Sequence, residues 1–128
     1  MFYRVDFAWE GKELPDYYST ILRIGELNEI WGQGLPQPQV FIRNVTVSPD
    51  NLILMSPDRS PTLKIILEDG ITILKFKSSK EEFESLRNNG VVKMDIVGTC
   101  NVNEWMGSFT PQIFITDYEI KRKATYYF

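Results

Sequence analysis

The sequence predicts a mainly β fold with two helices, and three observations carry this prediction. From Val40 onward, apolar residues recur at every second position in short segments that turn residues separate, which is typical of strands with one face on a core. The segment 79–88 has a helical pattern and falls between the third and fourth strand segments. Five antiparallel strands with a helix in that position follow the order of an OB-fold, a partly open Greek-key barrel.

The first three barrel strands are separated by short polar turns. VFIRNVTV and NLILM form one long strand that SPDN interrupts at residues 48–51, where we expect a tight turn or a bulged bend. TLKIILED at 62–69 and ITILKFK at 71–77 follow it. These two segments predict an antiparallel pair, because Asp69-Gly70 between them suits a two-residue hairpin turn.

The last two strands flank a polar segment. VVKMDIVG at 91–98 and PQIFITDYEI at 111–120 alternate in the manner of strands, whereas TCNVNEWMGSFT at 99–110 breaks the alternation. We interpret residues 99–110 as a loop that presents hydrogen-bonding groups and one aromatic side chain on a rigid scaffold.

Two segments have the signals of helices. Pro15 suits a first helical position, and the apolar residues that follow it have helical spacing, so we expect one amphipathic helix over 15–30. The second helix, 79–88, begins with a capping box formed by Ser79 and Glu82.

The chain is expected to form one barrel with short additions at both ends. FYRVDFAW at 2–9 is an unusually aromatic strand. With the helix and the Gly/Pro-rich connector after it, this strand makes up residues 1–37, which we interpret as the end of a preceding domain. Residues 38–120 form the OB-fold barrel, and residues 121–128 form a C-terminal tail with a basic run.

The composition excludes several kinds of chemistry. The chain has 128 residues, a formal charge of −3 and no histidine, which removes the commonest general base and the commonest transition-metal ligand. Its single cysteine, Cys100, has no intramolecular partner for a disulfide. With no leader and no long apolar run, we expect a cytoplasmic protein without a membrane segment.

The candidate binding surface follows from the expected fold. OB-folds bind on the outer face of the second and third strands, between the loops that join strands one to two and four to five. We assign Lys64, Lys75 and Lys77 to that face together with Ile66 and Ile73. The predicted nucleic-acid-binding residues are Arg59, Lys64, Lys75, Lys77, Asn101, Asn103 and Trp105.

Two stretches also resemble a known family. IWGQGLPQPQVFIRNVTV is similar to the entry into the C-terminal OB domain of RecJ-type single-strand-specific exonucleases, which belong to the DHH family, and KMDIVGTCNVNEWMGSFTPQIFITDYE is similar to the end of that domain. The resemblance covers essentially the whole chain and extends to prophage-type RecJ-like proteins.

The resemblance implies a function in DNA repair or recombination. It implies a non-catalytic module that helps hold single-stranded DNA for a 5′-to-3′ exonuclease, with the DHH catalytic and DHH-associated domains of a parent chain as partners. The DHH motif requires histidines, which this chain lacks, so we expect no catalytic residue here. We also expect no cofactor here, since the parent nuclease would bind its Mn or Mg ions elsewhere.

Several alternatives stay open. Trp105 either stacks on a base or tucks over the barrel end, and Asn101 and Asn103 either contact base edges or cap their own turn. Phe114 is either a stacking platform or a packing surface for the N-terminal helix, the role we favour. The alternative function is a protein-interaction or architectural barrel, with a homodimer through the aromatic strand at 2–9.

Overall fold

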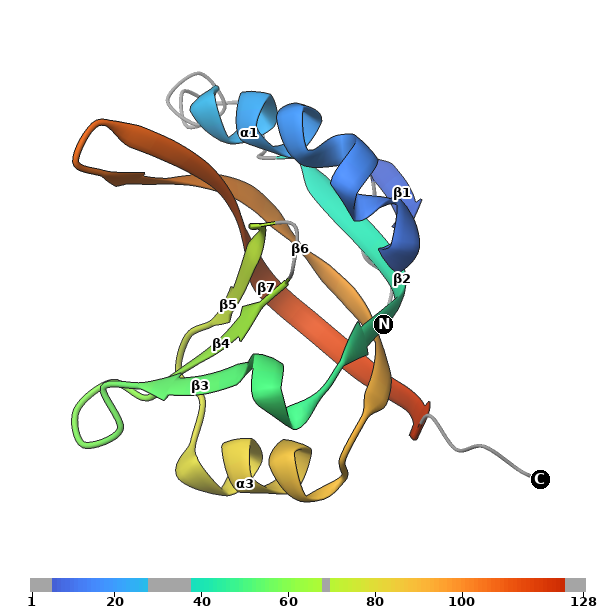
Figure 1. Ribbon diagram of the computed structural model, residues 1–128, viewed down its shortest axis with the longest axis vertical. Helices are drawn as coiled ribbons and strands as arrows, with labels where there is room; N and C mark the ends of the chain where they lie inside the picture. Colours follow the sequence, from blue (N-terminus) through green and yellow to red (C-terminus); the bar gives the residue numbers. More distant parts are fainter. Residues whose placement is uncertain (1–5, 28–37, 68–69, 124–128) are drawn as a thin grey trace.

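The computed structural model describes residues 6–27, 38–67 and 70–123. One curved sheet of seven strands runs through these residues, and helices lie at both ends of it (Figure 1). The elements in chain order are β1 (Phe7–Glu10), η1 (Gly11–Tyr17), α1 (Tyr18–Glu26), β2 (Gln39–Val47), η2 (Pro49–Asn51), β3 (Leu52–Met55), β4 (Thr62–Ile66), β5 (Thr72–Lys75), α3 (Lys80–Asn88), β6 (Val92–Trp105) and β7 (Ser108–Lys123).

The sheet has the strand order β1-β2-β6-β7-β5-β4-β3. β1 runs parallel to β2 and β5 runs parallel to β7, while the other neighbours are antiparallel. α3 falls between β5 and β6, as the sequence predicts for the helix of an OB-fold. The expected hairpin of β4 and β5 is also present, although residues 68–69 of its turn lie outside the described residues.

The prediction of a mainly β fold with two helices is confirmed, but the structure differs from the expected five-stranded, partly open barrel in two respects. The sheet has seven strands, and hydrogen bonding does not close it, since it ends at β1 on one side and at β3 on the other. The expected break at residues 48–51 explains one extra strand: η2 divides the first barrel strand into β2, which pairs with β6, and β3, which pairs with β4. β1 adds the other at the edge of β2.

The N-terminal elements differ in detail from the prediction. Within the described residues the expected strand covers Phe7–Glu10, and residues 1–5 lie outside them. The expected helix over 15–30 begins as the 3-10 helix η1 and continues as α1 only to Glu26. Pro15 lies inside η1 and does not open the α-helix, so our placement of it was wrong. Residues 28–37, which include most of the connector and the predicted domain boundary, are outside the described part.

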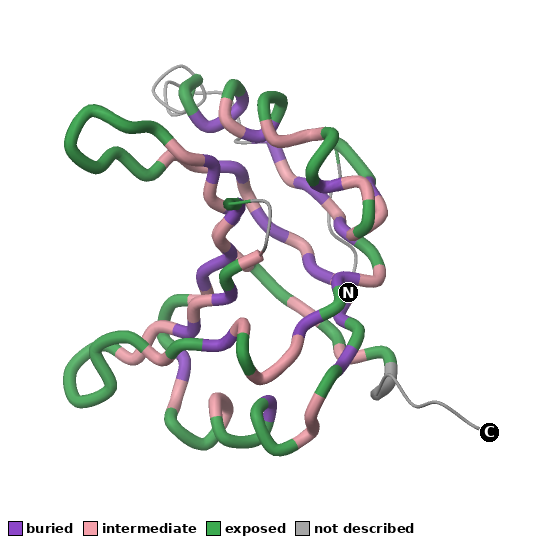
Figure 2. The backbone as a smooth tube through the Cα atoms, viewed as in Figure 1, coloured by how far each residue is buried: buried purple, intermediate pink, exposed green. Residues whose placement is uncertain are grey.

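One hydrophobic core joins the N-terminal elements to the barrel strands. Trp9, Leu14 and Ile21 belong to the same buried cluster as Ile42 and Met94. α1 covers one end of the curved sheet and α3 the other (Figure 1), and the buried positions alternate along the strands between them (Figure 2). None of the described helices is long and apolar enough to span a membrane.

Gly25 allows α1 to approach the sheet closely. A Cβ atom at Gly25 would lie 2.6 Å from the backbone carbonyl carbon of Asn101 in β6 and 2.8 Å from a methyl group of Val102. Neither backbone nor a packed methyl can move away at low cost. Glycine therefore sets the distance between the helix and the β6 strand.

The β6–β7 hairpin is longer than the sequence predicts. Residues 99–110 are not a loop, because β6 continues to Trp105 and β7 begins at Ser108, and the two strands are paired along this whole stretch. The turn consists of Met106 and Gly107, with φ values of 49° and 83°, as a two-residue primed turn requires. β7 also extends to Lys123, so residues 121–123 are strand and not tail, and residues 124–128 lie outside the described part.

Candidate functional site

The pairing register defines one continuous side of the sheet. Residues directly opposite each other on neighbouring strands point to the same side. Lys64 lies opposite Ile53 on β3 and Leu74 on β5. Leu74 in turn lies opposite Phe114 on β7, which lies opposite Thr99 on β6. These five residues make one row across five strands.

A second row runs beside the first, and we call the surface that both rows form the outer face. Ile66 lies opposite Thr72, Thr72 opposite Gln112, and Gln112 opposite Asn101. Because side chains alternate along a strand, the same side continues up the hairpin. The outer face comprises Ile53, Lys64, Ile66, Thr72, Leu74, Phe76, Thr99, Asn101, Asn103, Trp105, Ser108, Thr110, Gln112 and Phe114.

The outer face carries three aromatic and three amide side chains among its fourteen residues. The rings of Phe76 and Phe114 meet edge to face, with their centroids 4.9 Å apart and an interplanar angle of 86°. Phe76 is 49% exposed and Trp105 is 70% exposed. Asn101 donates from its side-chain amide to the backbone oxygen and to the hydroxyl of Thr99, at 3.3 Å each. Planar exposed rings with hydrogen-bonding groups between them are suited to planar, polar ligands.

Two projections flank the outer face. The β3–β4 loop, which carries the exposed Arg59, lies on one side, and the tip of the β6–β7 hairpin lies on the other (Figure 1). Both are exposed along their length (Figure 2). The predicted residues Arg59, Lys64 and Trp105 therefore belong to one surface and its two rims.

The placement of Lys75 and Ile73 on the outer face was wrong. Lys75 lies opposite Leu63 and Ile73 lies opposite Ile65, and the three apolar side chains of these pairs are fully buried. Thr72 and Leu74 take the outer positions that we assigned to their neighbours. A shift of one residue exchanges the two faces of a strand, and ITILKFK has apolar residues at both sets of positions.

Lys77 is exposed, but it is not on a strand. β5 ends at Lys75, and Lys77 lies in the connection to α3 with a φ of 57°. Our assignment of Lys77 to the strand face was wrong for that reason. Of the three lysines that we predicted for the face, only Lys64 points outward from a strand.

Lys75 instead joins a polar cluster beside α3. Its ammonium group lies 3.1 Å from Oε1 of Glu82, and the Tyr118 hydroxyl donates to Oε2 of Glu82 at 2.5 Å. Burial alone would raise the pKa of Glu82, but the hydrogen bonds from Tyr118 and Lys75 outweigh burial and lower that pKa. Burial and the bond to Glu82 raise the pKa of Tyr118. Lys75 is thus occupied by a structural partner.

The cluster also changes the expected capping box of α3. Ser79 accepts the backbone N–H of Glu82 at 3.0 Å, which confirms it as the N-cap. The second half of a capping box would be a hydrogen bond from the backbone N–H of Ser79 to the carboxylate of Glu82. That carboxylate instead binds Lys75 of β5 and Tyr118 of β7.

The structure decides two of the open alternatives. Trp105 is not tucked over the barrel end, because 70% of its surface is exposed. Phe114 packs its ring against Phe76, and the ring partner of Tyr17 in the N-terminal segment is Trp9. We favoured packing of Phe114 against the N-terminal helix, whereas its ring contact is with Phe76 on the outer face. Asn103 is exposed on the hairpin, and Asn101 is half-buried.

Sequence reasoning missed Phe76, Leu74 and Thr72 on the outer face. The available signal was the aromatic residue at the end of ITILKFK, since a phenylalanine two positions after an apolar strand residue can continue the same face. We grouped Phe76 with Thr72 and Leu74, as the structure does, but placed that group on the core side, because the lysines beside it indicated that the other set faced solvent.

The remaining candidates for reactive groups are the single cysteine and the acidic side chains. Cys100 is fully buried, and burial raises the pKa of its thiol to about 12, so the thiolate nucleophile is suppressed. Within residues 6–27, 38–67 and 70–123 there is no group of three or more cysteine, aspartate and glutamate side chains that could hold a metal ion.

The amino-acid sequence is similar to a known domain family and to two curated proteins. The family model described as the RecJ OB domain matches residues 13–117. YorK of Bacillus subtilis (strain 168), described as a candidate SPbeta prophage-derived single-strand DNA-specific exonuclease, is 28% identical over 119 residues, which are 92% of this chain and 20% of YorK. Its counterpart from Bacillus phage SPbeta matches equally. The chain thus spans about a fifth of the length of these relatives.

Among solved structures, an aspartyl-tRNA synthetase from Entamoeba histolytica aligns with the whole chain and with 27% of its own. The alignment has a TM-score of 0.49 and 16% sequence identity.

Proposed function

The chain belongs to the family of RecJ OB domains, and from that premise we propose that its outer face binds single-stranded nucleic acid and helps hold a DNA strand for a RecJ-like exonuclease. The observation that carries the proposal is the pairing register. It brings Trp105, Phe114 and Lys64 to one side of the sheet, although they lie on different strands.

The proposed contact is mainly one of stacking. Exposed aromatic rings on OB-folds stack on bases with little sequence preference, and each such base contributes about 1–3 kcal/mol. Trp105 and Phe76 offer two exposed rings, and the amides of Asn101, Asn103 and Gln112 offer hydrogen bonds between them. These groups fit the extended, unpaired bases of a single strand better than the regular phosphates of a duplex.

Phosphate contacts have a smaller part in this proposal. With Lys75 bound to Glu82, the predicted cations near the outer face are Lys64, Arg59 and Lys77. The chain as a whole is acidic, with a formal charge of −3, so nonspecific attraction of a polyanion is weak. Two or three phosphate contacts would give only a shallow dependence of affinity on salt concentration.

The module would act as one part of a longer nuclease. The curated relatives are about five times as long as the matching region, which covers 20% of them. In the proposal, hydrolysis and its divalent metal ions belong to the other domains of such a protein. A weakly binding module can still hold a strand when it is tethered, because tethering raises its effective concentration to the millimolar range.

The test compares two aromatic residues of the same hairpin. Trp105 lies on the outer side of the ribbon, while Phe109 lies opposite Glu104 on the other side and is 52% exposed. We expect Trp105→Ala to weaken binding of a fluorescein-labelled oligo-dT about tenfold. Phe109→Ala should leave that binding unchanged. Fluorescence anisotropy measures both, and equal effects of the two variants would reject the outer side of the hairpin as the contact.

A second candidate function rests on the free edge of β1. Among the described strands β1 pairs only with β2, and it carries the exposed Phe7, whose ring stacks on Trp9 with centroids 5.8 Å apart. The sequence FAWE offers no proline or lysine to protect the edge. Pairing of β1 with a second copy or another protein would cover this edge.

Light scattering after size exclusion tests self-pairing. We expect a dimer that the substitution Phe7→Lys dissociates. A monomer at all concentrations excludes self-pairing.

A further inference from the structure

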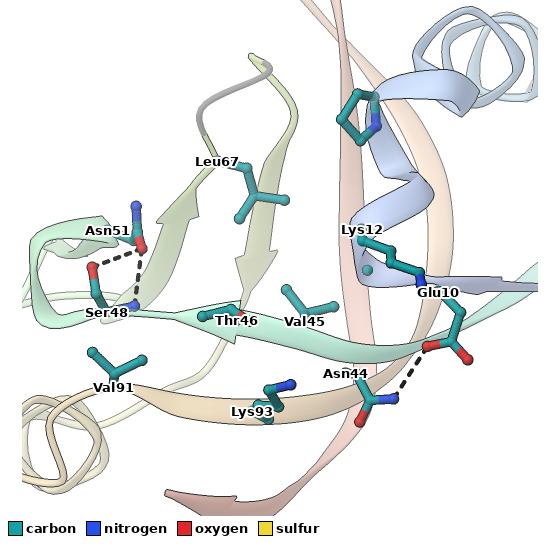
Figure 3. A pocket seen from close by; sticks show the side chains of 12 residues that line it. Glu10, Lys12, Asn44, Val45, Thr46, Ser48, Asn51, Leu67, Val91 and Lys93 are labelled. Atoms are coloured by element: carbon teal, nitrogen blue, oxygen red, sulfur yellow. Dashed lines mark hydrogen bonds between the residues drawn. The ribbon is translucent and has the colours of Figure 1, made fainter. Parts of the chain in front are cut away.

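A cleft with a volume of about 870 Å³ lies on another flank of the barrel (Figure 3). It opens where the first barrel strand is broken, because β3 pairs with β4 whereas β2 does not. Its walls are the end of β1, η1, residues 44–46 of β2, Ser48 and Asn51 at η2, Leu67 and the residues around the start of β6. We call it the seam cleft. The outer face, by contrast, is built on β3, β4, β5, β7 and the upper part of β6.

Two lysines give the seam cleft its charge. Lys12 of η1 and Lys93 of β6 line it, and neither forms an ion pair with the described residues. The one acidic residue in the lining, Glu10, is already neutralised: Arg43 lies 2.7 Å from its Oε1, and the Asn44 amide donates to its Oε2 at 3.1 Å. The uncompensated charge of the cleft is therefore positive, in a chain that is acidic overall.

Polar and apolar groups line different parts of the cleft. Thr46 lies directly opposite Lys93 on the paired strand β6, so both side chains project from the same side of the sheet. Leu67 and Val91, the residue just before β6, contribute aliphatic side chains to the lining (Figure 3). A volume of this size falls within the range of about 300–1,000 Å³ that is typical of small-molecule sites, which combine apolar walls with a few placed polar groups.

We propose that the seam cleft binds a phosphate monoester attached to a small organic body, of which a mononucleotide is an example. Two lysines can share the charge of a phosphate dianion through charge-assisted hydrogen bonds. The Thr46 hydroxyl provides a further donor, and the aliphatic side chains of Leu67 and Val91 offer apolar contacts to the organic body. This inference does not depend on the function proposed for the outer face.

Calorimetric titration of the chain with adenosine monophosphate tests the proposal. We expect saturable binding that adenosine and inorganic phosphate each match only weakly. Lys12→Ala and Lys93→Ala should each weaken it about tenfold, as the loss of one charge-assisted hydrogen bond would. Both side chains are exposed, so the variants should unfold at the temperature of the unaltered chain. Arg23→Ala, which removes an exposed cation on α1 outside both the seam cleft and the outer face, is the control and should leave binding unchanged.

The position and the source of the ligand are read from amide chemical shifts. Shifts at Lys12, Thr46 and Lys93 on adding the nucleotide support the seam cleft. Binding that persists in the double variant Lys12→Ala/Lys93→Ala, or shifts confined to the outer face, overturn the proposal. The same titration with an oligonucleotide distinguishes two sources of the phosphate. If the 5′-phosphorylated oligonucleotide produces the same shifts and its 5′-hydroxyl form does not, the ligand is the end of a strand. If neither oligonucleotide produces them, the ligand is the free mononucleotide. Oligo-dT binding lost with Trp105→Ala is a separate readout of the outer face.

Discussion

Lys64 and Lys75 lie on neighbouring strands, in adjacent cross-strand pairs, but they belong to different regions of the molecule. Lys64 points to the outer face, opposite Leu74, and has no acidic partner among the described residues. Lys75 points to the core side, opposite Leu63, and is bound to Glu82 of α3. The comparison teaches that strand parity decides whether a lysine is available to a ligand or committed to the fold.

The largest effect that tests this comparison concerns the apolar partners of the two lysines. Leu63→Ala on the core side should lower the free energy of unfolding by about 3 kcal/mol, because Leu63 is fully buried and its loss leaves a cavity. Ile53→Ala, opposite Lys64 and 43% exposed, should cost less than about 1 kcal/mol. Urea denaturation measures both, and equal losses would contradict the assigned faces.

The next effect concerns the polar cluster. Glu82→Ala removes the acceptor of both Lys75 and Tyr118, and it should destabilise the fold by about 2 kcal/mol, the range for a part-buried charged hydrogen-bonding group. Glu84→Ala, an exposed position of the same helix, is the control and should change stability by less than about 0.5 kcal/mol. Thermal unfolding that is equally affected by the two variants would mean that the cluster adds nothing.

A smaller effect is expected on the salt dependence of binding. Each phosphate contact on a single strand adds about 0.7 to the slope of log affinity against log salt concentration. Lys64→Gln should reduce that slope by about 0.7, whereas Arg23→Gln, an exposed cation on α1, should not alter it. Anisotropy titrations with oligo-dT at several salt concentrations measure the slope, and an unchanged slope for Lys64→Gln would remove Lys64 from the phosphate contacts.

The smallest effect is a dependence of stability on pH. The pKa of Glu82 is lower in the folded state than its usual value of 4.5, so the charged form stabilises the fold. This contribution is fully present above pH 4.5 and is lost as the pH falls through the lowered folded-state pKa. We expect the difference in unfolding free energy between the unaltered chain and Glu82→Gln to shrink over that acidic interval. A difference that stays constant there would contradict the lowered pKa.

The order of the elements could be predicted from the sequence, because turn residues and periodicity are local signals. The break at residues 48–51 and the Ser79 N-cap are examples, and both are present in the structure. The resemblance to RecJ OB domains is confirmed by the family match. Strand parity at 71–77 could not be predicted in this way, since apolar residues occupy both faces and only the pairing with β4 and β7 decides between them.

The extent of the hairpin also depended on distant contacts. Residues 99–110 contain two asparagines and a glycine, which favour turns. In the structure they continue the ladder on both strands, and α1 lies against β6 through Gly25. Neither the partner strand nor the supporting helix is visible in the local pattern, so the segment looked like a loop.

α1 contacts the base of the hairpin, where Gly25 meets Asn101 and Val102 of β6. Residues 103–109 beyond this contact are exposed, and the ribbon closes with a turn of only two residues, Met106 and Gly107. Such a ribbon can gain or lose cross-strand pairs without a change of register in the barrel. The reach of this arm is therefore a quantity that evolution, or a protein engineer, can set independently of the rest of the domain.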